Sequence, residues 1–173
     1  MAIINQAISQ QFFLWDDILV QSEIVLDAYG SLERANIYFD NRLRAEPWKR
    51  SSIGDRKAAM LEATELIDRL NFVSSKSLET QLHQFPRNAD LTVPSEIEKA
   101  CYEIALKLLD GYDPDMEVDN LAAESQGFST VRETYNRTFA LDHMRAGIPS
   151  AKAWEYLKPY LAEYRSIKIC RVD

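Results

Sequence analysis

Residues 94–111 read PSEIEKACYEIALKLLDG, and their apolar side chains recur at the three- and four-residue spacing of an amphipathic helix. Pro94 suits the first helical position, and Glu96 and Glu98 suit the positive N-terminal end of the helix dipole. Gly111 suits the position just beyond the C-terminus. The apolar face consists of Ile97, Ala100, Cys101, Ile104, Ala105, Leu108 and Leu109. We therefore predict a long helix with one face in the core.

A first helix is predicted upstream, beginning after the N-cap Ser31 and ending near Arg44. Its apolar stripe consists of Leu32, Ala35, Tyr38, Phe39 and Leu43, and Tyr38 and Phe39 are expected to be buried. Pro47 disfavours helical geometry at Glu46, so a loop is expected there. Trp48 is expected to fold back from this loop onto the core, with its indole N–H on a carbonyl or water.

A second helix is predicted from about Gly54 to Leu70, after Ser51, Ser52 and Asp55. Its small residues Ala58, Ala59 and Ala63 permit the close approach of a partner helix. Residues 72–93 then form a polar connection that is long for a compact domain, which indicates an ordered or functional loop.

The pattern changes beyond Gly111. Residues 116–135 favour a two-stranded ribbon that turns near Ser125–Gly127, and a helix is the rival interpretation. Pro149 and Ser150 open a last helix, which Pro159 should kink or end. Residues 166–172 alternate in the manner of a strand, and a strand at a chain end can pair with another chain.

These elements predict a mainly α protein: a small helical bundle with a minor β-ribbon and a C-terminal strand or extended tail. We divide the chain into an N-terminal arm (1–27), a helical core (28–112) and a ribbon, helix and C-terminal tail (113–173). The arm carries the aromatic cluster Phe12, Phe13 and Trp15. Either it folds against a neighbouring subunit or it caps the protein's own core.

The chain has 173 residues, a formal net charge of −7 and a pI near 4.9. This acidity counts against a protein dedicated to coating DNA, because such proteins neutralise phosphates with basic patches. One local basic strip contains Arg42, Arg44, Lys49, Arg50, Arg56 and Lys57. Asp40, Glu46, Asp55 and Glu62 interleave with it, which favours a solvated helix face over a nucleic-acid contact.

Catalytic and metal-binding patterns do not emerge from the sequence. His83 and His143 lack metal-type spacing to another ligand, and each is interpreted as a surface or hydrogen-bonding histidine. The chain shows no nucleotide fingerprint and no nucleophile elbow. Cys101 is expected to be a small buried hydrophobe. We expect no enzyme activity, no cofactor, no metal and no membrane partner.

The order of several motifs resembles a tailed-phage family that is labelled either head-to-tail connector (adaptor) or DnaT-like single-stranded-DNA-binding protein. The motifs are Ala28–Phe39, Arg42-Leu43, Trp48, Asp55-Arg56, Ala58–Thr64, Ile67–Leu70, Gln81–Arg87, Val93-Pro94 with the helix that follows, and Leu157-x-Pro159-Tyr160-Leu161. The likeness covers roughly residues 28–110 well and 154–172 loosely. The chain departs from the family where a glycine usually follows the second helix, because Val73-Ser74-Ser75 stands there.

The resemblance implies a structural virion protein in the neck between head and tail, made in the host cytoplasm. Its partners would be the portal protein, a tail or neck protein, and further copies of itself in a ring that is typically twelvefold. DNA would pass through the ring without specific binding, which suits an acidic protein. By this analogy Ile167, Ile169 and Val172 would dock on the portal, and Phe12, Phe13 and Trp15 are further interface candidates. The alternative is a single-stranded-DNA-binding replication accessory protein, which the acidity disfavours.

Overall fold

The computed structural model describes residues 27–116, 125–128, 131–134 and 141–162. Its helices are α2 (Leu32–Asp40), α3 (Glu46–Arg50), α4 (Ile53–Asp68), α5 (Ser95–Leu109), α7 (Asp142–Arg145) and α8 (Ala151–Leu157), followed by the 3-10 turn η1 (Lys158–Tyr160). The predicted mainly α class is confirmed. Among these helices none combines the length and the apolar character that crossing a membrane requires.

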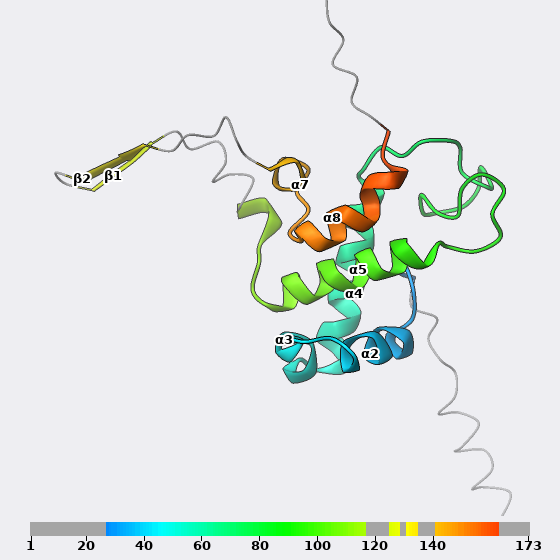
Figure 1. The fold of residues 1–173 in the computed structure, drawn as a ribbon, viewed down its shortest axis with the longest axis horizontal. Coiled ribbons are helices and arrows are strands. Elements are labelled where there is room, and N and C mark those ends of the chain that lie inside the picture. Colours follow the sequence, from blue (N-terminus) through cyan, green and yellow to red (C-terminus); the bar gives the residue numbers. More distant parts are fainter. Residues whose placement is uncertain (1–26, 117–124, 129–130, 135–140, 163–173) are drawn as a thin grey trace, which may run out of the picture.

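Helix α5 lies at the centre of the fold and packs against α4 and α8 (Figure 1). Its predicted apolar face is confirmed, because Ile97, Ala100, Cys101, Ile104 and Ala105 are fully buried. Pro94 is the N-cap rather than the first helical residue, so the helix begins at Ser95, one residue later than predicted. Gly111 follows the helix with φ of +90°, a backbone conformation that glycine adopts without a Cβ penalty.

Helix α2 begins as predicted, with the Ser31 hydroxyl accepting a hydrogen bond from the Arg34 amide at 3.2 Å. It ends at Asp40 rather than near Arg44. The expected loop at Pro47 is wrong, because proline lacks only an N–H that the first turn of a helix does not use, and Pro47 lies in the first turn of α3. Trp48 therefore lies in a helix, although it does fold back onto the core.

Trp48 joins α2 to α3. Its ring centroid lies 4.6 Å from that of Phe39, and its Nε1–H donates to the Asn36 side-chain carbonyl at 2.9 Å. The expectation of a buried indole bonded to a carbonyl is thus confirmed. Phe39 is fully buried, whereas Tyr38 is only partly buried.

Helix α4 begins with a capping box, in which the Asp55 amide donates to the Ser52 hydroxyl and the Ser52 amide donates to the Asp55 carboxylate. Ala59 and Ala63 are buried against neighbouring helices, as predicted, but Ala58 is exposed. The small buried side chains allow α4 and α5 to pack closely.

The long connection between α4 and α5 is ordered, as predicted. The Arg87 guanidinium holds it by donating to the carbonyls of Phe72, Val73 and Ser74. Ser74 has φ of +67°, so the left-handed backbone conformation forms here without the family's glycine. Several leucines of this loop remain exposed, namely Leu78, Leu82 and Leu91.

Beyond α5, the described residues include strands β1 (Ser125–Phe128) and β2 (Val131–Thr134), paired antiparallel with Phe128 opposite Val131. The predicted turn at Ser125–Gly127 is wrong, because these residues lie within β1. Helix α8 begins after the N-cap Ser150, and Pro159 ends it by entering η1, as predicted. Ile148, Ala153 and Leu157 join the same core as α4 and α5.

Candidate nucleic-acid interface

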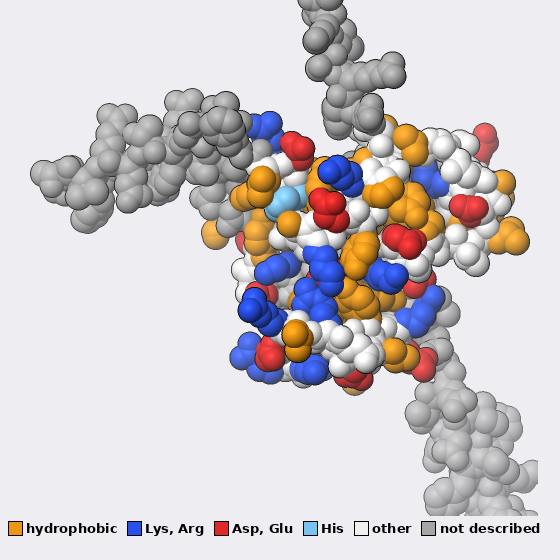
Figure 2. Space-filling view, in the orientation of Figure 1, with side chains coloured by type: hydrophobic (Ala, Val, Ile, Leu, Met, Phe, Trp, Pro, Cys, Tyr) orange, Lys and Arg blue, Asp and Glu red, His pale blue; other side chains and the backbone are white. Residues whose placement is uncertain are grey.

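A locally basic segment occupies residues 41–57, at the end of α2, through α3 and into α4. It holds six basic and two acidic side chains, a net charge of +4 in a chain whose net charge is −7. Figure 2 shows Lys and Arg side chains gathered at the lower left of the visible face, around the position of α3 in Figure 1. The structure divides these cations into two groups with different surroundings.

Arg42 belongs to the first group, in which the guanidinium is fastened to the fold. Its Nε and Nη2 donate to the two carboxylate oxygens of Glu103, each at 2.6 Å, and its Nη1 donates to the Leu43 carbonyl at 3.0 Å. This bidentate contact fixes the guanidinium plane. Arg42 therefore has little capacity left for an external anion.

Glu103 is a buried carboxylate on α5, with 1% of its surface exposed. It also accepts hydrogen bonds from the Lys152 ammonium at 2.8 Å and from the Tyr38 hydroxyl at 2.5 Å. Burial alone would raise the pKa of Glu103, but the hydrogen bonds from Lys152, Tyr38 and Arg42 lower it below its ordinary value. We call these four residues the Glu103 cluster; it connects α2, α5 and α8.

Arg56 is the second fastened cation. Its Nε donates to the Trp48 carbonyl at 2.8 Å and its Nη2 to the Lys49 carbonyl at 3.0 Å. The guanidinium carbon lies 5.5 Å from the Trp48 ring centroid, a cation–π distance. Arg56 thus satisfies two carbonyls at the end of α3 and holds that helix to α4.

The other four basic residues, Arg44, Lys49, Arg50 and Lys57, form no side-chain hydrogen bond or ion pair with any described residue. We call them the free cations. Arg44, Lys49 and Arg50 are exposed. Arg44 also has φ of +59°, which is uncommon for a residue other than glycine. Strained conformations of this kind are found preferentially at functional sites.

This arrangement suits contact with phosphates rather than with bases. Lys and Arg side chains on an exposed surface attract a nucleic-acid backbone and release its counterions. Stacking requires an accessible ring. Phe39 and Trp48 are buried, and the hydroxyl of Tyr38 is held by Glu103. The three rings nearest the basic segment, Tyr38, Phe39 and Trp48, are therefore not freely available for stacking with bases.

The residues singled out as interface candidates lie outside the described part of the chain: Phe12, Phe13, Trp15, Ile167, Ile169 and Val172. The Glu103 cluster was missed by sequence reasoning. Its signal was available, because Glu103 lies three residues after Ala100, on the otherwise apolar face of residues 94–111. A charged residue at such a position requires a partner when the helix is buried.

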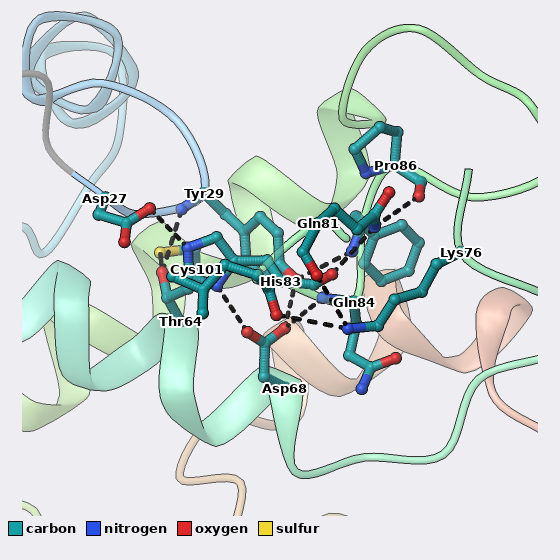
Figure 3. Close-up of polar contacts among 12 residues, drawn as sticks. Asp27, Tyr29, Thr64, Asp68, Lys76, Gln81, His83, Gln84, Pro86 and Cys101 are labelled. Atoms are coloured by element: carbon teal, nitrogen blue, oxygen red, sulfur yellow. Dashed lines mark hydrogen bonds and ion pairs between the residues drawn. The ribbon is translucent and has the colours of Figure 1, made fainter. Parts of the chain in front are cut away.

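A second polar group lies near the C-terminal end of α4 and contains His83 (Figure 3). Its two ring nitrogens contact Asp68 and Asp27, at 2.7 and 2.8 Å, so the interpretation of a hydrogen-bonding histidine is confirmed. His143 likewise contacts the Ile148 carbonyl through Nδ1, at 2.9 Å. Cys101 is fully buried, as predicted, and burial raises the pKa of its thiol to about 12. Across the described ranges, no set of three or more His, Cys, Asp or Glu side chains is arranged to hold a metal ion.

Comparison with known proteins gives one finding about the family. No curated protein and no solved structure matches the chain. A family model described as "Putative DnaT-like ssDNA binding protein" matches residues 22–172. This match extends from before α2 to beyond η1, and so covers all the described elements. The chain therefore belongs to the family of putative DnaT-like single-stranded-DNA-binding proteins.

Proposed function

We propose that this protein binds single-stranded DNA through the free cations Arg44, Lys49, Arg50 and Lys57. The observation that carries the proposal is the separation of the basic residues into fastened and free groups, in a chain that belongs to a family described as DnaT-like and ssDNA-binding. The overall charge of −7 is compatible with this role, because screening limits interactions between exposed charges to about 10 Å at 0.1 M salt. The local charge of residues 41–57 then matters more than the total.

The proposed mode of binding is contact with the phosphate backbone. Binding would therefore depend strongly on salt and weakly on base sequence. Each phosphate contact contributes about 0.7 to the slope of log affinity against log salt for a single strand. The role is one of binding and not of catalysis.

Fluorescence anisotropy of a labelled oligo-dT, measured at several salt concentrations, tests this proposal. The triple variant R44Q/K49Q/R50Q should lose about 2 from the salt slope. The matched control R69Q/K107Q/K158Q removes the same charge from exposed positions outside the basic segment and should retain the wild-type slope. Absence of salt-dependent binding by the wild-type chain, or equal losses in both triple variants, would contradict the proposal.

A second candidate function is a structural head-to-tail adaptor of a phage particle, located in the virion neck. The ordered resemblance of the motifs supports it, and so does the loop between α4 and α5, which is held rigidly by Arg87 while Leu78, Leu82 and Leu91 are exposed. Exposed apolar side chains on an ordered loop suit contact with another protein. The partners would be the portal protein, a tail or neck protein, and other copies of the chain in a ring, with DNA passing through unbound.

Co-sedimentation with portal rings tests this second candidate. The full chain should sediment with the rings, and a chain truncated after Tyr164, which lacks Ile167, Ile169 and Val172, should not. If the truncated chain sediments equally, the assignment of docking to these three residues is wrong. If the full chain binds oligo-dT through the free cations and does not sediment with portal rings, the adaptor function is excluded in favour of DNA binding.

A further inference from the structure

His83 lies between two carboxylates from different parts of the chain. Its Nδ1 is 2.7 Å from Oδ2 of Asp68, and its Nε2 is 2.8 Å from Oδ1 of Asp27. A neutral imidazole has one N–H donor and one acceptor nitrogen, and a carboxylate oxygen only accepts. Both contacts are hydrogen bonds only when both ring nitrogens carry hydrogen. The geometry is therefore that of an imidazolium.

These contacts fasten three segments to one another, as Figure 3 shows. Asp27 precedes α2, Asp68 is the last residue of α4, and His83 lies in the long loop. Oδ1 of Asp68 also accepts a hydrogen bond from the Gln84 amide at 3.0 Å and one from the Tyr29 hydroxyl. The Tyr29 hydroxyl in turn accepts from the Phe85 amide at 3.1 Å.

We propose that His83 is a pH-sensitive clamp, which joins Asp27 to Asp68 at the end of α4 while its imidazole is protonated and releases Asp27 when the proton is lost. Deprotonation leaves one ring nitrogen as an acceptor that faces a carboxylate oxygen, so one of the two contacts becomes repulsive. The Asp27 contact should open first, because the side chain of Asp27 is 65% exposed and that of Asp68 only 23%. The proposal does not depend on the DNA-binding function.

The electrostatic surroundings of His83 agree with this assignment. Burial by itself lowers the pKa of His83, but the hydrogen bonds and charges of Asp68 and Asp27 outweigh it and raise the pKa above its ordinary value. Glu65 of α4 and Arg69, the residue that follows α4, line the same hollow and carry opposite charges. On the loop, the Lys76 ammonium lies against the Gln81 and Leu82 carbonyls, and the Tyr29 ring lies 5.4 Å from the imidazole.

The direction of the pH dependence follows from the raised pKa. The unfolded chain has an ordinary histidine with a pKa near 6.5. The clamp therefore contributes its full stabilisation below about pH 6.5, and this contribution disappears as the pH rises through the higher pKa of the folded state. The clamp should be closed in mildly acidic solution and open in alkaline solution.

NMR titration and amide hydrogen exchange of the full chain test the clamp. His83 should titrate above pH 6.5, with H143Q used to assign the two histidine signals. The Tyr29 amide lies two residues from Asp27 and donates to the Thr64 hydroxyl at 3.0 Å. Its protection factor, corrected for intrinsic exchange, should fall about tenfold across this titration, as expected for the loss of the charge-assisted hydrogen bond between Asp27 and His83. In D27N, which retains the fold because Asp27 is exposed, the His83 pKa should be lower than in the wild type.

H83Q provides the matched control, because glutamine can donate to one carboxylate but does not titrate. The Tyr29 protection factor of H83Q should not change over the same pH range. Three results would overturn the proposal: a His83 pKa at or below that of an unstructured histidine, a wild-type Tyr29 protection factor that stays constant through the His83 titration, or the same pH dependence in H83Q as in the wild type.

Discussion

Arg42 and Arg44 are two residues apart, carry the same side chain and have opposite environments. Arg42 makes a bidentate contact with the buried Glu103. Arg44 is exposed, has no side-chain partner among the described residues and adopts a left-handed backbone conformation. The cations of the Glu103 cluster thus stabilise the fold, whereas the free cations are available to a ligand.

Residue type and local sequence therefore do not determine whether a charged side chain stabilises the fold or is available to a ligand. A buried carboxylate such as Glu103 is costly to desolvate unless cations and hydrogen-bond donors surround it. Glu103 is therefore paired with Arg42 and Lys152, which are 61 and 49 residues away in the sequence. A basic residue that does not contact such a buried carboxylate remains available to solvent or to a phosphate group.

The largest effect is expected from removing the centre of the Glu103 cluster. E103A should lower the free energy of unfolding by about 3–5 kcal/mol, because breaking a buried ion pair leaves its partners uncompensated. Urea unfolding measures this change. The control D110A removes the carboxylate of the Lys107–Asp110 pair, in which both side chains are about half exposed, and should cost less than about 1 kcal/mol. Equal losses of unfolding free energy in E103A and D110A would contradict the proposed difference between buried and exposed charges.

The next largest effect should separate the two neighbouring arginines. R42M should lower the free energy of unfolding by about 2 kcal/mol, because it removes two charge-assisted hydrogen bonds to Glu103. R44M should change it by less than about 0.5 kcal/mol, because the Arg44 side chain is exposed and forms no hydrogen bond or ion pair with a described residue. Thermal and urea unfolding of both variants give the comparison, and a costly R44M would show that Arg44 belongs to the fold.

A smaller effect on stability is expected at the start of α4, which lies between Lys49-Arg50 and Arg56-Lys57. S52A removes the side-chain half of the capping box and should cost about 1 kcal/mol. The control T80A changes an exposed hydroxyl that has no partner among the described residues, and should leave stability unchanged. Since S52A leaves all the free cations in place, the salt slope of oligo-dT binding should equal that of the wild type. A reduced slope would show that the cap also positions the interface.

The smallest effect should come from a single free cation. K49Q should reduce the salt slope of oligo-dT binding by about 0.7, the contribution of one phosphate contact to a single strand. It should change the free energy of unfolding by less than about 0.5 kcal/mol, because Lys49 is exposed. The control K158Q should alter neither quantity. A change in stability without a change in slope would place Lys49 with the fastened cations.

Much of the helical core could be predicted because the relevant signals are local. The apolar periodicity of residues 94–111, the cap at Ser31 and the stop at Pro159 each act within one or two turns. The error at Pro47 has a local cause of a different kind, since proline both disfavours a preceding helical residue and suits the first turn of a new helix. Local rules alone do not decide between these two outcomes.

The candidate site was less accessible to sequence reasoning. The basic strip was recognised, but as a solvated helix face, because its charges were counted together and interleaved acids were set against them. The separation into fastened and free cations depends on Glu103, Trp48 and Asn36, which approach only in the folded chain. The same holds for His83, whose two carboxylates lie 15 and 56 residues away.

Sequence reasoning alone was enough to predict a mainly helical protein, the limits of α4 and α5 to within a turn, and the buried face of α5. Helix caps, apolar periodicity and backbone restrictions act over a few residues, so they can be recognised without knowledge of the tertiary structure. The role of each charge, by contrast, became clear only from the folded structure. The desolvation of Glu103 and the two-sided contact of His83 arise when distant segments meet, because the energy of a charge is set by what replaces its water.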